Sequence, residues 1–417
     1  MHLSAGDRVA LLVPGSVAYV ELVLTLLCRG VFPIPMDPRL TATEREPLLA
    51  DLAPHLVLTQ QAEVDRLAVG PGVGLPRGRP IHVTSGTTGR PKGVWSGLLD
   101  DAAAEALVRE ERELWGFSPD DVNLVLGPLH HSAPLRFAMG TVLAGGRVVA
   151  PGPFDPATVT AAIRRERPTT MFCVPAHLQR LFAHWEQVGA PDLSCFRLVA
   201  HAGAPCPPAV KHRLIELFQD GSTWEFYGST EGQFTACRSE EWLECPGTVG
   251  RARPGRTMHA SDDGTLWCVV PNYARFSYLH DPEKTAAAWR DTADGPAFTV
   301  GDLGRIDADG YVYLEGRGED LIISGGVNVY PTEVENVLRG APGVSDVAVF
   351  GVDDETWGRR VCAAFVGTTE PAALTSYARE RLSPAKRPKE YHRLDDLPRT
   401  ATGKVRRLDL PDLCGNS

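Results

Sequence analysis

The chain is 417 residues long, which at roughly 100–200 residues per domain predicts two to four domains. Its hydrophobic fraction of 43% and charged fraction of 23% exclude disorder, collagen and coiled coil as the main state. The net charge of −10 argues against a non-specific nucleic-acid binder, although a small anion can still bind at a local positive site.

The nine cysteines are scattered without a C-x-x-C pair, which indicates neither a disulfide framework nor a zinc site. We interpret them as buried free thiols in the reducing cytoplasm. The N-terminus lacks the charged-then-apolar pattern of a signal peptide. The most apolar early stretch, Val17 to Cys28, is interrupted by Glu21 and is too short to span a bilayer. We therefore expect a cytoplasmic protein with no membrane span.

The N-terminal residues predict alternating strands and helices, with Ser16 as the cap of the first helix. We expect strands at 8–13, 31–36 and 55–59, and helices at 18–29 and 43–52. Prolines in the second strand place it at a sheet edge. Strands that alternate with helices favour an open, largely parallel α/β sheet.

A linker rich in Gly and Pro is expected at 61–80, after which the α/β pattern resumes. We expect strands at 121–126, 169–174 and 197–200, and helices at 102–115, 157–165 and 208–218. From about Gly247 onward, short strands and turns indicate a small β-rich module. The C-terminal part combines helices at 331–338 and 372–382 with a strand at 344–350, which predicts a small α+β domain.

The most informative segment is Ile81 to Val94, where a strand leads into a loop of Gly, Ser and Thr that closes at Lys92. Glycines let the backbone approach an anion closely, and free N–H groups form a concave nest. Hydroxyl side chains add donors, and the lysine supplies a point charge. The loop suits a triphosphate. It is not a Walker A loop, because Gly89 and Lys92 are not adjacent and no Ser or Thr follows the lysine.

This loop resembles the signature of the adenylate-forming superfamily, which includes acyl-CoA synthetases, non-ribosomal peptide adenylation domains and luciferases. The resemblance implies that ATP is bound by Thr84, Ser85, Gly86, Thr87, Thr88, Gly89 and Lys92. Gly203 and Ala204 resemble the family's adenine-wall segment. Further motifs extend the resemblance from about Asp7 to Arg407, nearly the whole chain.

Tyr227-Gly228-Ser229-Thr230-Glu231 resembles a second motif of the family and follows a predicted strand. Mg²⁺ prefers one or two carboxylates plus phosphate oxygens, so Glu231 is the candidate metal ligand, with a solvated turn carboxylate as the alternative. The resemblance implies that Thr230 donates to the α-phosphate and that Tyr227 lies along the adenine. His131 resembles the family's gate between the acyl and nucleotide sites; the alternative is a structural loop histidine.

Asp302, in Gly301-Asp302-Leu303-Gly304, resembles the family's Thr-Gly-Asp element, whose aspartate binds the ribose hydroxyls. A carboxylate can accept hydrogen bonds from both hydroxyls at once, and such bonds are charge-assisted. Val300 stands where the family usually has threonine. Arg317 resembles the ribose-contacting arginine that ends the large domain.

The C-terminal motifs begin at Glu319, which occupies the hinge position where the family usually has Asp or Lys. Gly325 and Gly326 resemble the glycines beside the pantetheine tunnel, where a side chain would block a thiol, or else form a plain turn. Lys404 resembles the catalytic lysine, which would balance charge on the carboxylate and the α-phosphate in the transition state. The alternative is a solvated basic tail.

Together these features predict an α/β fold with an AMP-binding N-terminal domain at 1–317 and a small mobile α+β domain at 318–417. The large domain would combine α/β subdomains with a small β-barrel-like module. Members of the family are usually longer. We therefore expect a trimmed start, whose sheet edge is covered by its own repacking or by a second subunit in a homodimer.

The resemblance implies ATP-dependent activation of a carboxylic acid to acyl-AMP with release of pyrophosphate, then transfer to the thiol of coenzyme A. A carrier-protein phosphopantetheine would use the same tunnel, and a partial enzyme that performs one half-reaction stays open. An aryl or aliphatic acid is expected rather than an α-amino acid, because Ser132-Ala133-Pro134-Leu135 lacks the aspartate that holds an α-ammonium in relatives. Arg136, alone among apolar neighbours, pairs with a second acidic or polar substrate group or serves only structure.

Overall fold

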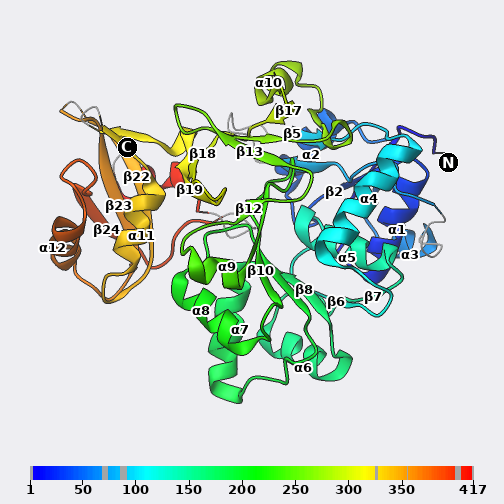
Figure 1. Cartoon of the computed structure of the whole chain (residues 1–417), viewed down its shortest axis with the longest axis horizontal. Helices are drawn as coiled ribbons and strands as arrows, with labels where there is room; N and C mark the ends of the chain where they lie inside the picture. Colours follow the sequence, from blue (N-terminus) through cyan, green and yellow to red (C-terminus); the bar gives the residue numbers. More distant parts are fainter. Residues whose placement is uncertain are drawn as a thin grey trace. The chain divides into compact units, whose positions relative to one another are not determined.

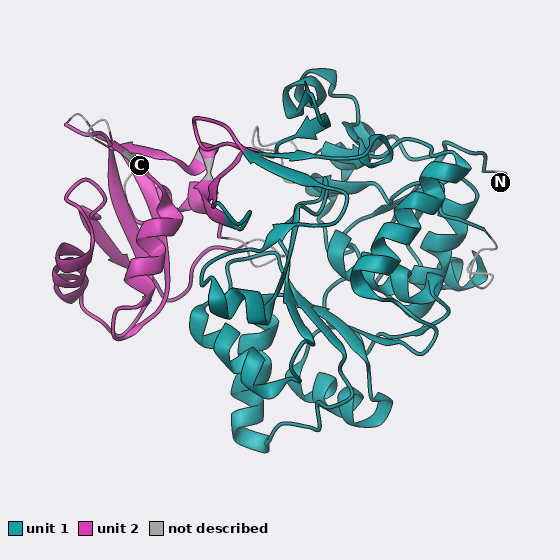
Figure 2. Cartoon of the chain, in the orientation of Figure 1, with its two compact units in different colours: residues 1–259, 267–300, 308–312 teal, residues 260–266, 301–307, 313–417 magenta. Residues whose placement is uncertain are grey.

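The computed structural model describes residues 3–67, 74–84, 92–324, 327–354, 356–399 and 405–415, without the side chains of Arg317, Glu319 and Asn328. Figure 1 traces the order of helices and strands along the chain. The chain forms two compact units (Figure 2). Unit 1 comprises residues 1–259, 267–300 and 308–312, and unit 2 comprises residues 260–266, 301–307 and 313–417. In the described ranges, no helix is both long enough and apolar enough to pass through a bilayer.

Unit 1 begins with a parallel three-stranded sheet in the order β2-β1-β3. Its strands are β1 (Arg8–Leu11), β2 (Phe32–Pro35) and β3 (Leu56–Leu58). The predicted edge position of the proline-containing strand is confirmed. Ser16 caps α1 (Val17–Cys28), since its hydroxyl accepts a hydrogen bond from Tyr19 N at 3.1 Å.

A larger sheet of unit 1 has the strand order β12-β11-β10-β9-β8-β6-β7. The pairs among β7, β6, β8, β9 and β10 are parallel, whereas β11 and β12 add antiparallel, so the expected largely parallel sheet is confirmed. The strands are β6 (Val122–Val125), β7 (Arg147–Val149), β8 (Thr170–Cys173), β9 (Leu198–His201), β10 (Thr223–Glu225), β11 (Thr235–Arg238) and β12 (Arg251–Ala252).

Helices connect and cover the two sheets of unit 1 (Figure 1). They are α2 (Ala42–Leu52), α3 (Gln61–Leu67), α4 (Asp101–Trp115), α5 (Ser132–Leu143), α6 (Pro156–Glu166), α7 (Pro175–Val188), α8 (Pro208–Leu217), α9 (Ser239–Glu244) and α10 (Pro282–Ala288). Helix α3 occupies the start of the expected 61–80 linker, so that expectation is wrong there.

Helix α5 was not expected from the sequence, because Pro134 and Gly140 resemble breakers. Pro134 lies in the first turn, where its missing N–H has no intrahelical partner in any case. A Cβ at Gly140 would lie 2.4 Å from a ring carbon of Phe117, so only glycine permits this packing. Leu135 packs in the core of the N-terminal sheet, and Phe137 packs in a separate aromatic cluster. Packing on both sides therefore holds α5 in place.

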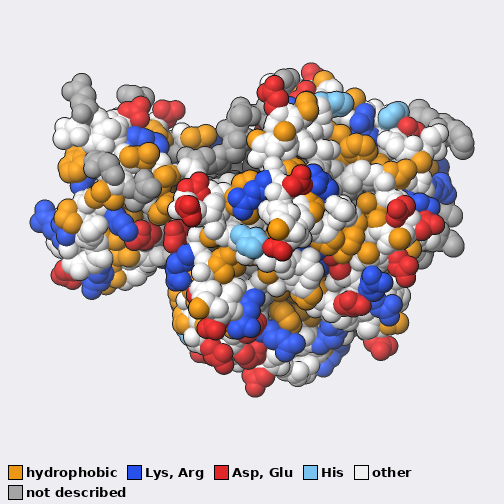
Figure 3. Space-filling model, turned by 45° about the horizontal axis from the view of Figure 1, so that its top comes forward, with side chains coloured by type: hydrophobic (Ala, Val, Ile, Leu, Met, Phe, Trp, Pro, Cys, Tyr) orange, Lys and Arg blue, Asp and Glu red, His pale blue; other side chains and the backbone are white. Residues whose placement is uncertain are grey.

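Two smaller sheets form a β-rich part of the chain. One has the order β15-β5-β4, and another the order β13-β14-β17-β16. Their strands are β4 (His82–Thr84), β5 (Lys92–Trp95), β13 (Thr257–Ala260), β14 (Leu266–Val269), β15 (Ser277–Tyr278), β16 (Trp289–Thr292) and β17 (Gly295–Phe298), with the 3-10 turn η1 (Asn272–Ala274) beside them. Figure 3 shows basic and acidic side chains interspersed on the face that it presents.

Unit 2 contains a β-hairpin and an α+β module, as expected for the C-terminal part. The hairpin strands are β18 (Asp302–Ile306) and β19 (Val312–Arg317), followed by η2 (Gly318–Asp320). The module contains β20 (Ile322–Ser324), β21 (Val327–Val329), α11 (Pro331–Arg339), β22 (Val344–Asp354), β23 (Gly358–Gly367), α12 (Pro371–Arg381), β24 (Glu390–Arg393), η3 (Arg407–Asp409) and α13 (Leu410–Leu413). Helices α11 and α12 cover the sheet through a common apolar core that includes Leu338, Phe365 and Leu374.

Candidate active site

A cavity of about 170 Å³ lies inside unit 1, bordered by α4, α5 and the segment before β4. Part of its wall is apolar and includes Leu107 and Val108 from α4 and Leu135 and Met139 from α5. Another part carries arginine and glutamate side chains, and Thr230 also lines it. The cavity therefore suits a small ligand that has both an apolar body and a polar group.

The predicted motif at 227–231 forms a tight turn after β10. Gly228 and Gln233 form an antiparallel bridge across the turn. A Cβ at Gly228 would lie 2.9 Å from Gln233 Cα, so the turn requires glycine at this position. The turn brings Thr230 and Glu231 to the lining of the cavity. Two of the predicted site residues thus share one wall.

The carboxylate of Glu231 is buried beside the strand that closes the glycine-rich loop. Glu231 is 6% exposed, and its Oε1 accepts a hydrogen bond from the Tyr278 hydroxyl at 2.9 Å. Tyr278 lies on β15, which pairs with β5, and β5 begins at Lys92. A single carboxylate at such a position fits Mg²⁺ that takes its other ligands from phosphate oxygens and water.

Thr84 and Lys92 are the described ends of the glycine-rich loop, and they face each other as the last pair of the β4–β5 ladder. Lys92 Nζ lies 3.7 Å from a carboxylate oxygen of Asp281. The loop residues Ser85, Gly86, Thr87, Thr88 and Gly89 lie outside the described residues. The ladder therefore brings the two ends of the predicted phosphate-binding loop together.

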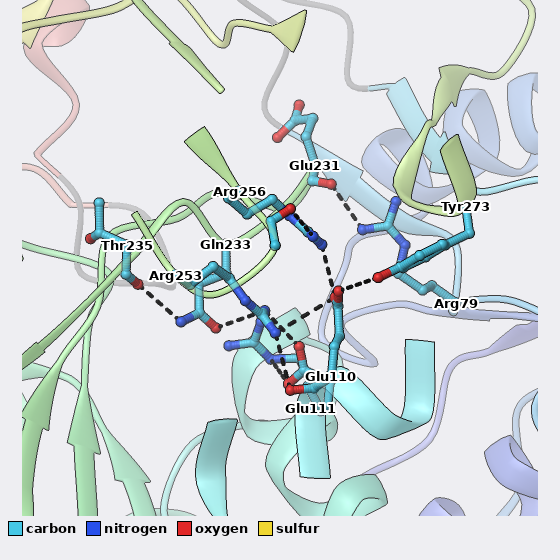
Figure 4. A network of polar contacts seen from close by, with 11 residues as sticks. Arg79, Glu110, Glu111, Glu231, Gln233, Thr235, Arg253, Arg256 and Tyr273 are labelled. Atoms are coloured by element: carbon cyan, nitrogen blue, oxygen red, sulfur yellow. Dashed lines mark hydrogen bonds and ion pairs between the residues drawn. The ribbon is translucent and has the colours of Figure 1, made fainter. Parts of the chain in front are cut away.

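Charged side chains from distant parts of the sequence form a network at the cavity (Figure 4). Arg253 Nη1 donates to Glu111 Oε1 at 2.7 Å, and Arg256 Nη2 donates to Glu110 Oε1 at 2.8 Å. The Tyr273 hydroxyl donates to the other oxygen of Glu110 at 2.9 Å. Helix α4 thus presents two adjacent carboxylates, each held by an arginine from the segment after β12.

Two further arginines join this network from other directions. Arg79 Nη1 donates to the backbone carbonyl of Glu231 at 2.9 Å. Arg136, on α5, places its Nε 3.6 Å from Glu111 Oε2 and its Cζ 5.1 Å from the centre of the Phe226 ring. The sequence had singled out Arg136 among apolar neighbours, and the structure places it on the cavity wall.

Two members of the network have pKa values far from neutral pH. Burial alone would raise the pKa of Glu111, but the charges of Arg136 and Arg253 outweigh it and hold this pKa at about 2. Burial lowers the pKa of Arg79 to about 10. Burial also lowers the pKa of Arg136. Because the pKa of Glu111 lies far below 7 and that of Arg79 far above it, both groups are ionised at neutral pH.

His131 forms the N-cap of α5 and precedes Ser132, which lines the cavity. Its ring centre lies 4.3 Å from that of His130. Burial, with the nearby charges of His130 and His82, lowers the pKa of His131 to about 3, so the imidazole is neutral at pH 7. A neutral ring at this position suits a gate and argues against a resident positive charge.

The predicted adenine contacts follow two adjacent strands. Gly203 and Ala204 follow β9 and are exposed, whereas Tyr227 follows β10 and is 8% exposed. Tyr227 stacks on Phe234, with ring centres 4.6 Å apart. Because β9 and β10 are parallel neighbours, their carboxyl ends bring both segments to one edge of the sheet.

The remaining predicted residues belong to unit 2. Asp302 is 9% exposed at the start of β18, and Arg317 ends β19, its hairpin partner. Gly318 N donates to Gly301 O at 2.9 Å, which brings the residues next to Asp302 and Arg317 into contact. Glu319 follows in η2.

Three predicted residues of unit 2 lie outside the described residues: Gly325, Gly326 and Lys404. Strands β20 and β21, which flank the two glycines, form an antiparallel pair. Arg399 and Val405, on either side of the lysine segment, form an antiparallel bridge.

Several polar residues of the cavity were not anticipated from the sequence. Neither Arg79 nor the pair Glu110 and Glu111 belongs to a motif, and Arg253 and Arg256 stand in an ordinary Pro–Gly turn. The only available signal was a Glu-Glu pair on a helix that also carries apolar residues. That pattern is usual for a solvated helix face.

Family models match both parts of the chain. The model for the AMP-binding enzyme matches residues 81–273, and that for the AMP-binding enzyme C-terminal domain matches residues 333–404. The chain belongs to the family of AMP-binding enzymes, and the resemblance seen in the motifs is confirmed.

Two similar proteins are named as a CoA synthase and a CoA ligase. Feruloyl-CoA synthase of Amycolatopsis sp. is 33% identical over 446 residues, which cover 96% of this chain and 87% of the relative. The 2-succinylbenzoate–CoA ligase of Geobacillus kaustophilus is 33% identical over 456 residues, which cover 98% of this chain and 88% of that relative. The chain is accordingly an acid–thiol ligase of the acyl-CoA synthetase type.

Solved structures agree with the predicted fold class. The o-succinylbenzoate CoA synthetase of Bacillus subtilis, in complex with its acyl-adenylate intermediate, has a TM-score of 0.83 at 27% identity and covers 98% of this chain and 88% of that one. The same synthetase in complex with ATP and a magnesium ion also has a TM-score of 0.83 at 27% identity, with coverage of 98% and 90%.

Proposed function

We propose that this chain activates a small carboxylic acid with ATP and transfers the acyl group to coenzyme A. A carboxylate oxygen of the acid attacks the α-phosphorus, and the bond to the β-phosphate breaks, so acyl-AMP forms and pyrophosphate leaves. The thiol then attacks the acyl carbon, and AMP leaves. The observation that carries the proposal is the cavity whose wall includes Thr230 and Glu231, beside the β4–β5 ladder that brings the two ends of the glycine-rich loop together.

The residues of unit 1 have distinct roles in this proposal. Lys92 and the loop residues bind the phosphates, Thr230 donates to the α-phosphate, and Glu231 holds Mg²⁺, which when bound neutralises phosphate charge. Tyr227 and the segment at Gly203 bound the adenine. Positioning and charge balance supply most of the catalysis, because phosphoryl chemistry needs little covalent help.

The residues of unit 2 also have roles in this proposal. Asp302 and Arg317 bind the ribose, which their neighbouring places on the β18–β19 hairpin support. Lys404 balances charge during adenylation, and Gly325 and Gly326 leave space for the thiol. The domains are 1–317 and 318–417, with Glu319 as the hinge between the two half-reactions.

Coenzyme A is the acceptor that the relatives' names support. A carrier-protein phosphopantetheine and a single half-reaction are the alternatives that the test below separates. We place the reaction in the cytoplasm, because all nine cysteines are free thiols. A second subunit that covers an edge of the first sheet stays a prediction, to be checked by the mass of the protein in solution.

The test measures pyrophosphate release with ATP, Mg²⁺ and a panel of small acids, and then thioester formation with coenzyme A and with a phosphopantetheinylated carrier protein. We expect release with at least one acid and thioester with coenzyme A. Lys404→Ala should abolish release yet still form thioester from a supplied acyl-adenylate. A folded protein that binds ATP but releases no pyrophosphate with any acid would contradict the proposal.

A further inference from the structure

The cavity lining carries more positive than negative charge. It contains five arginines against three glutamates: Arg79, Arg112, Arg136, Arg253 and Arg256 against Glu110, Glu111 and Glu231. Arg253 forms an ion pair with Glu111, and Arg256 forms one with Glu110. The two arginine side chains are only 2% and 6% exposed. The excess charge therefore belongs to the other arginines.

Three of the cavity arginines hold unsatisfied donors. Among the described residues, no hydrogen-bond partner reaches Arg79 Nη2, Arg136 Nε, Arg136 Nη2 or Arg253 Nε, although all four atoms are shielded from solvent. Arg253 already donates to Glu111 through its Nη1, so Arg79 and Arg136 carry the donors without a carboxylate hydrogen bond. The Arg136 side chain as a whole is nonetheless 25% exposed, as expected for a side chain that lines a cavity. Buried donors on a charged group are costly unless a partner satisfies them, and an anion is the partner that matches both charge and geometry.

The size of the cavity limits what such a ligand can be. A cavity of about 150 Å³ holds a benzene molecule, and this one has about 170 Å³. It has room for a ring or a short chain against Leu107, Leu135 and Met139. The reacting carboxyl would lie at the Thr230 side, where the motif of the nucleotide site lines the cavity.

We infer that the acid activated by this enzyme is compact and carries a second anionic group, a carboxylate, that binds between Arg79 and Arg136. This inference rests on the proposed adenylation and names the substrate class for it. An acid with an α-ammonium is disfavoured by the same arginines. Glu111 stays paired with Arg253 and so leaves Arg136 able to turn its Nη2 toward the ligand.

The experiment compares acids that share a carbon skeleton around the reacting carboxylate and differ in the second group. Succinate is set against succinamate and butyrate, and terephthalate against 4-carbamoylbenzoate and benzoate, with pyrophosphate release as the readout. We expect kcat/KM for a diacid to exceed that for its amide by at least about 50-fold in one of the two series. Arg136→Gln should reduce this ratio at least tenfold, and Arg136→Lys, which keeps the charge but not the planar fork, should reduce it less.

Arg213→Gln is the matched control, because Arg213 forms an exposed pair with Glu216 on α8 at 3.1 Å, and the diacid preference should not change. Amides or monoacids used as well as diacids, or a preference unchanged in Arg136→Gln, would overturn the inference while the adenylation stands. If no acid releases pyrophosphate, the inference is tested by calorimetry instead. The binding of succinate and terephthalate is then compared between the unsubstituted protein and Arg136→Gln. Tighter binding to the unsubstituted protein supports the anion site, and equal or absent binding refutes it.

Discussion

Unit 1 contains two buried ionic clusters that are built differently. In the first, Lys211 on α8 lies between two neighbouring strands: its Nζ is 2.8 Å from His201 Nε2 and 3.3 Å from Glu225 Oε2. One ammonium faces one carboxylate. The lysine must donate, so His201 accepts at Nε2, and burial together with Lys211 keeps the pKa of this imidazole well below its usual range.

The second cluster is the cavity network, where, among the described residues, arginines outnumber carboxylates and three guanidinium groups keep unused donors. Lys211 and His201 are fully buried and line no part of this cavity. A charge-matched cluster with no cavity beside it stabilises the fold. A cluster with excess positive charge beside a cavity is instead suited to bind a ligand. Substitutions in the first should therefore affect stability, and substitutions in the second should affect substrate choice.

The largest expected effect on stability is that of Lys211→Met, which leaves Glu225 buried without its counter-ion. Breaking a buried ion pair on one side costs about 3–5 kcal/mol. Urea unfolding at pH 7 should show a loss in this range. The double variant Lys211→Met with Glu225→Gln should recover most of it, because no unpaired charge is left. A loss below about 1 kcal/mol in the single variant would show that this cluster does not stabilise the fold in the way that distinguishes it from the cavity network.

An intermediate effect is expected for Glu111→Gln, which removes one carboxylate from the cavity network. The loss at pH 7 should be about 1–3 kcal/mol, because Arg253 loses its charged partner. The pKa of Glu111 lies at about 2 in the folded chain, below its ordinary value of 4.5. Its contribution is therefore complete above pH 4.5 and is lost as the pH falls towards 2.

Unfolding free energies measured at pH 5, 4 and 3 test this predicted loss of stability at low pH. The unsubstituted protein should lose more stability across that interval than Glu111→Gln does. Parallel curves for the two proteins would show that Glu111 is not held in its ionised form by the arginines.

A smaller effect on stability than that of Glu111→Gln is expected for Arg136→Gln, although its effect on substrate preference should be large. Glu111 keeps its 2.7 Å bond from Arg253, and the buried donors of Arg136 are removed together with its charge. We expect a change of less than about 1 kcal/mol in urea unfolding. Arg213→Gln, at an exposed pair, should change it by about 0.5 kcal/mol at most. A loss above about 2 kcal/mol for Arg136→Gln would mean that the arginine serves the fold.

The motif residues could be predicted because each motif is local. The turn at 227–231, the strand before the glycine-rich loop and the order of strands and helices are all encoded by neighbours in the sequence. The ionic network is not local: Arg253 and Glu111 are 142 residues apart, and Arg79 and Glu231 are 152 apart. Arg136 was the member of the network that the sequence singled out, as a charge among apolar neighbours. Helix α5 was not predicted, because it contains Pro134 and Gly140. Pro134 is tolerated in the first turn of the helix, and Gly140 is required where the Phe117 ring packs; the sequence spacing reveals neither.

The central claim is that a carboxylate attacks the α-phosphorus of ATP and that a thiol then displaces AMP. An acid labelled with ¹⁸O in its carboxyl group, turned over with ATP, Mg²⁺ and coenzyme A, tests both steps at once. Because the attacking oxygen stays on phosphorus when the acyl–oxygen bond breaks, mass spectrometry should find one ¹⁸O in each AMP and none in pyrophosphate. Unlabelled AMP, or label in orthophosphate with ADP as the other product, would contradict the account.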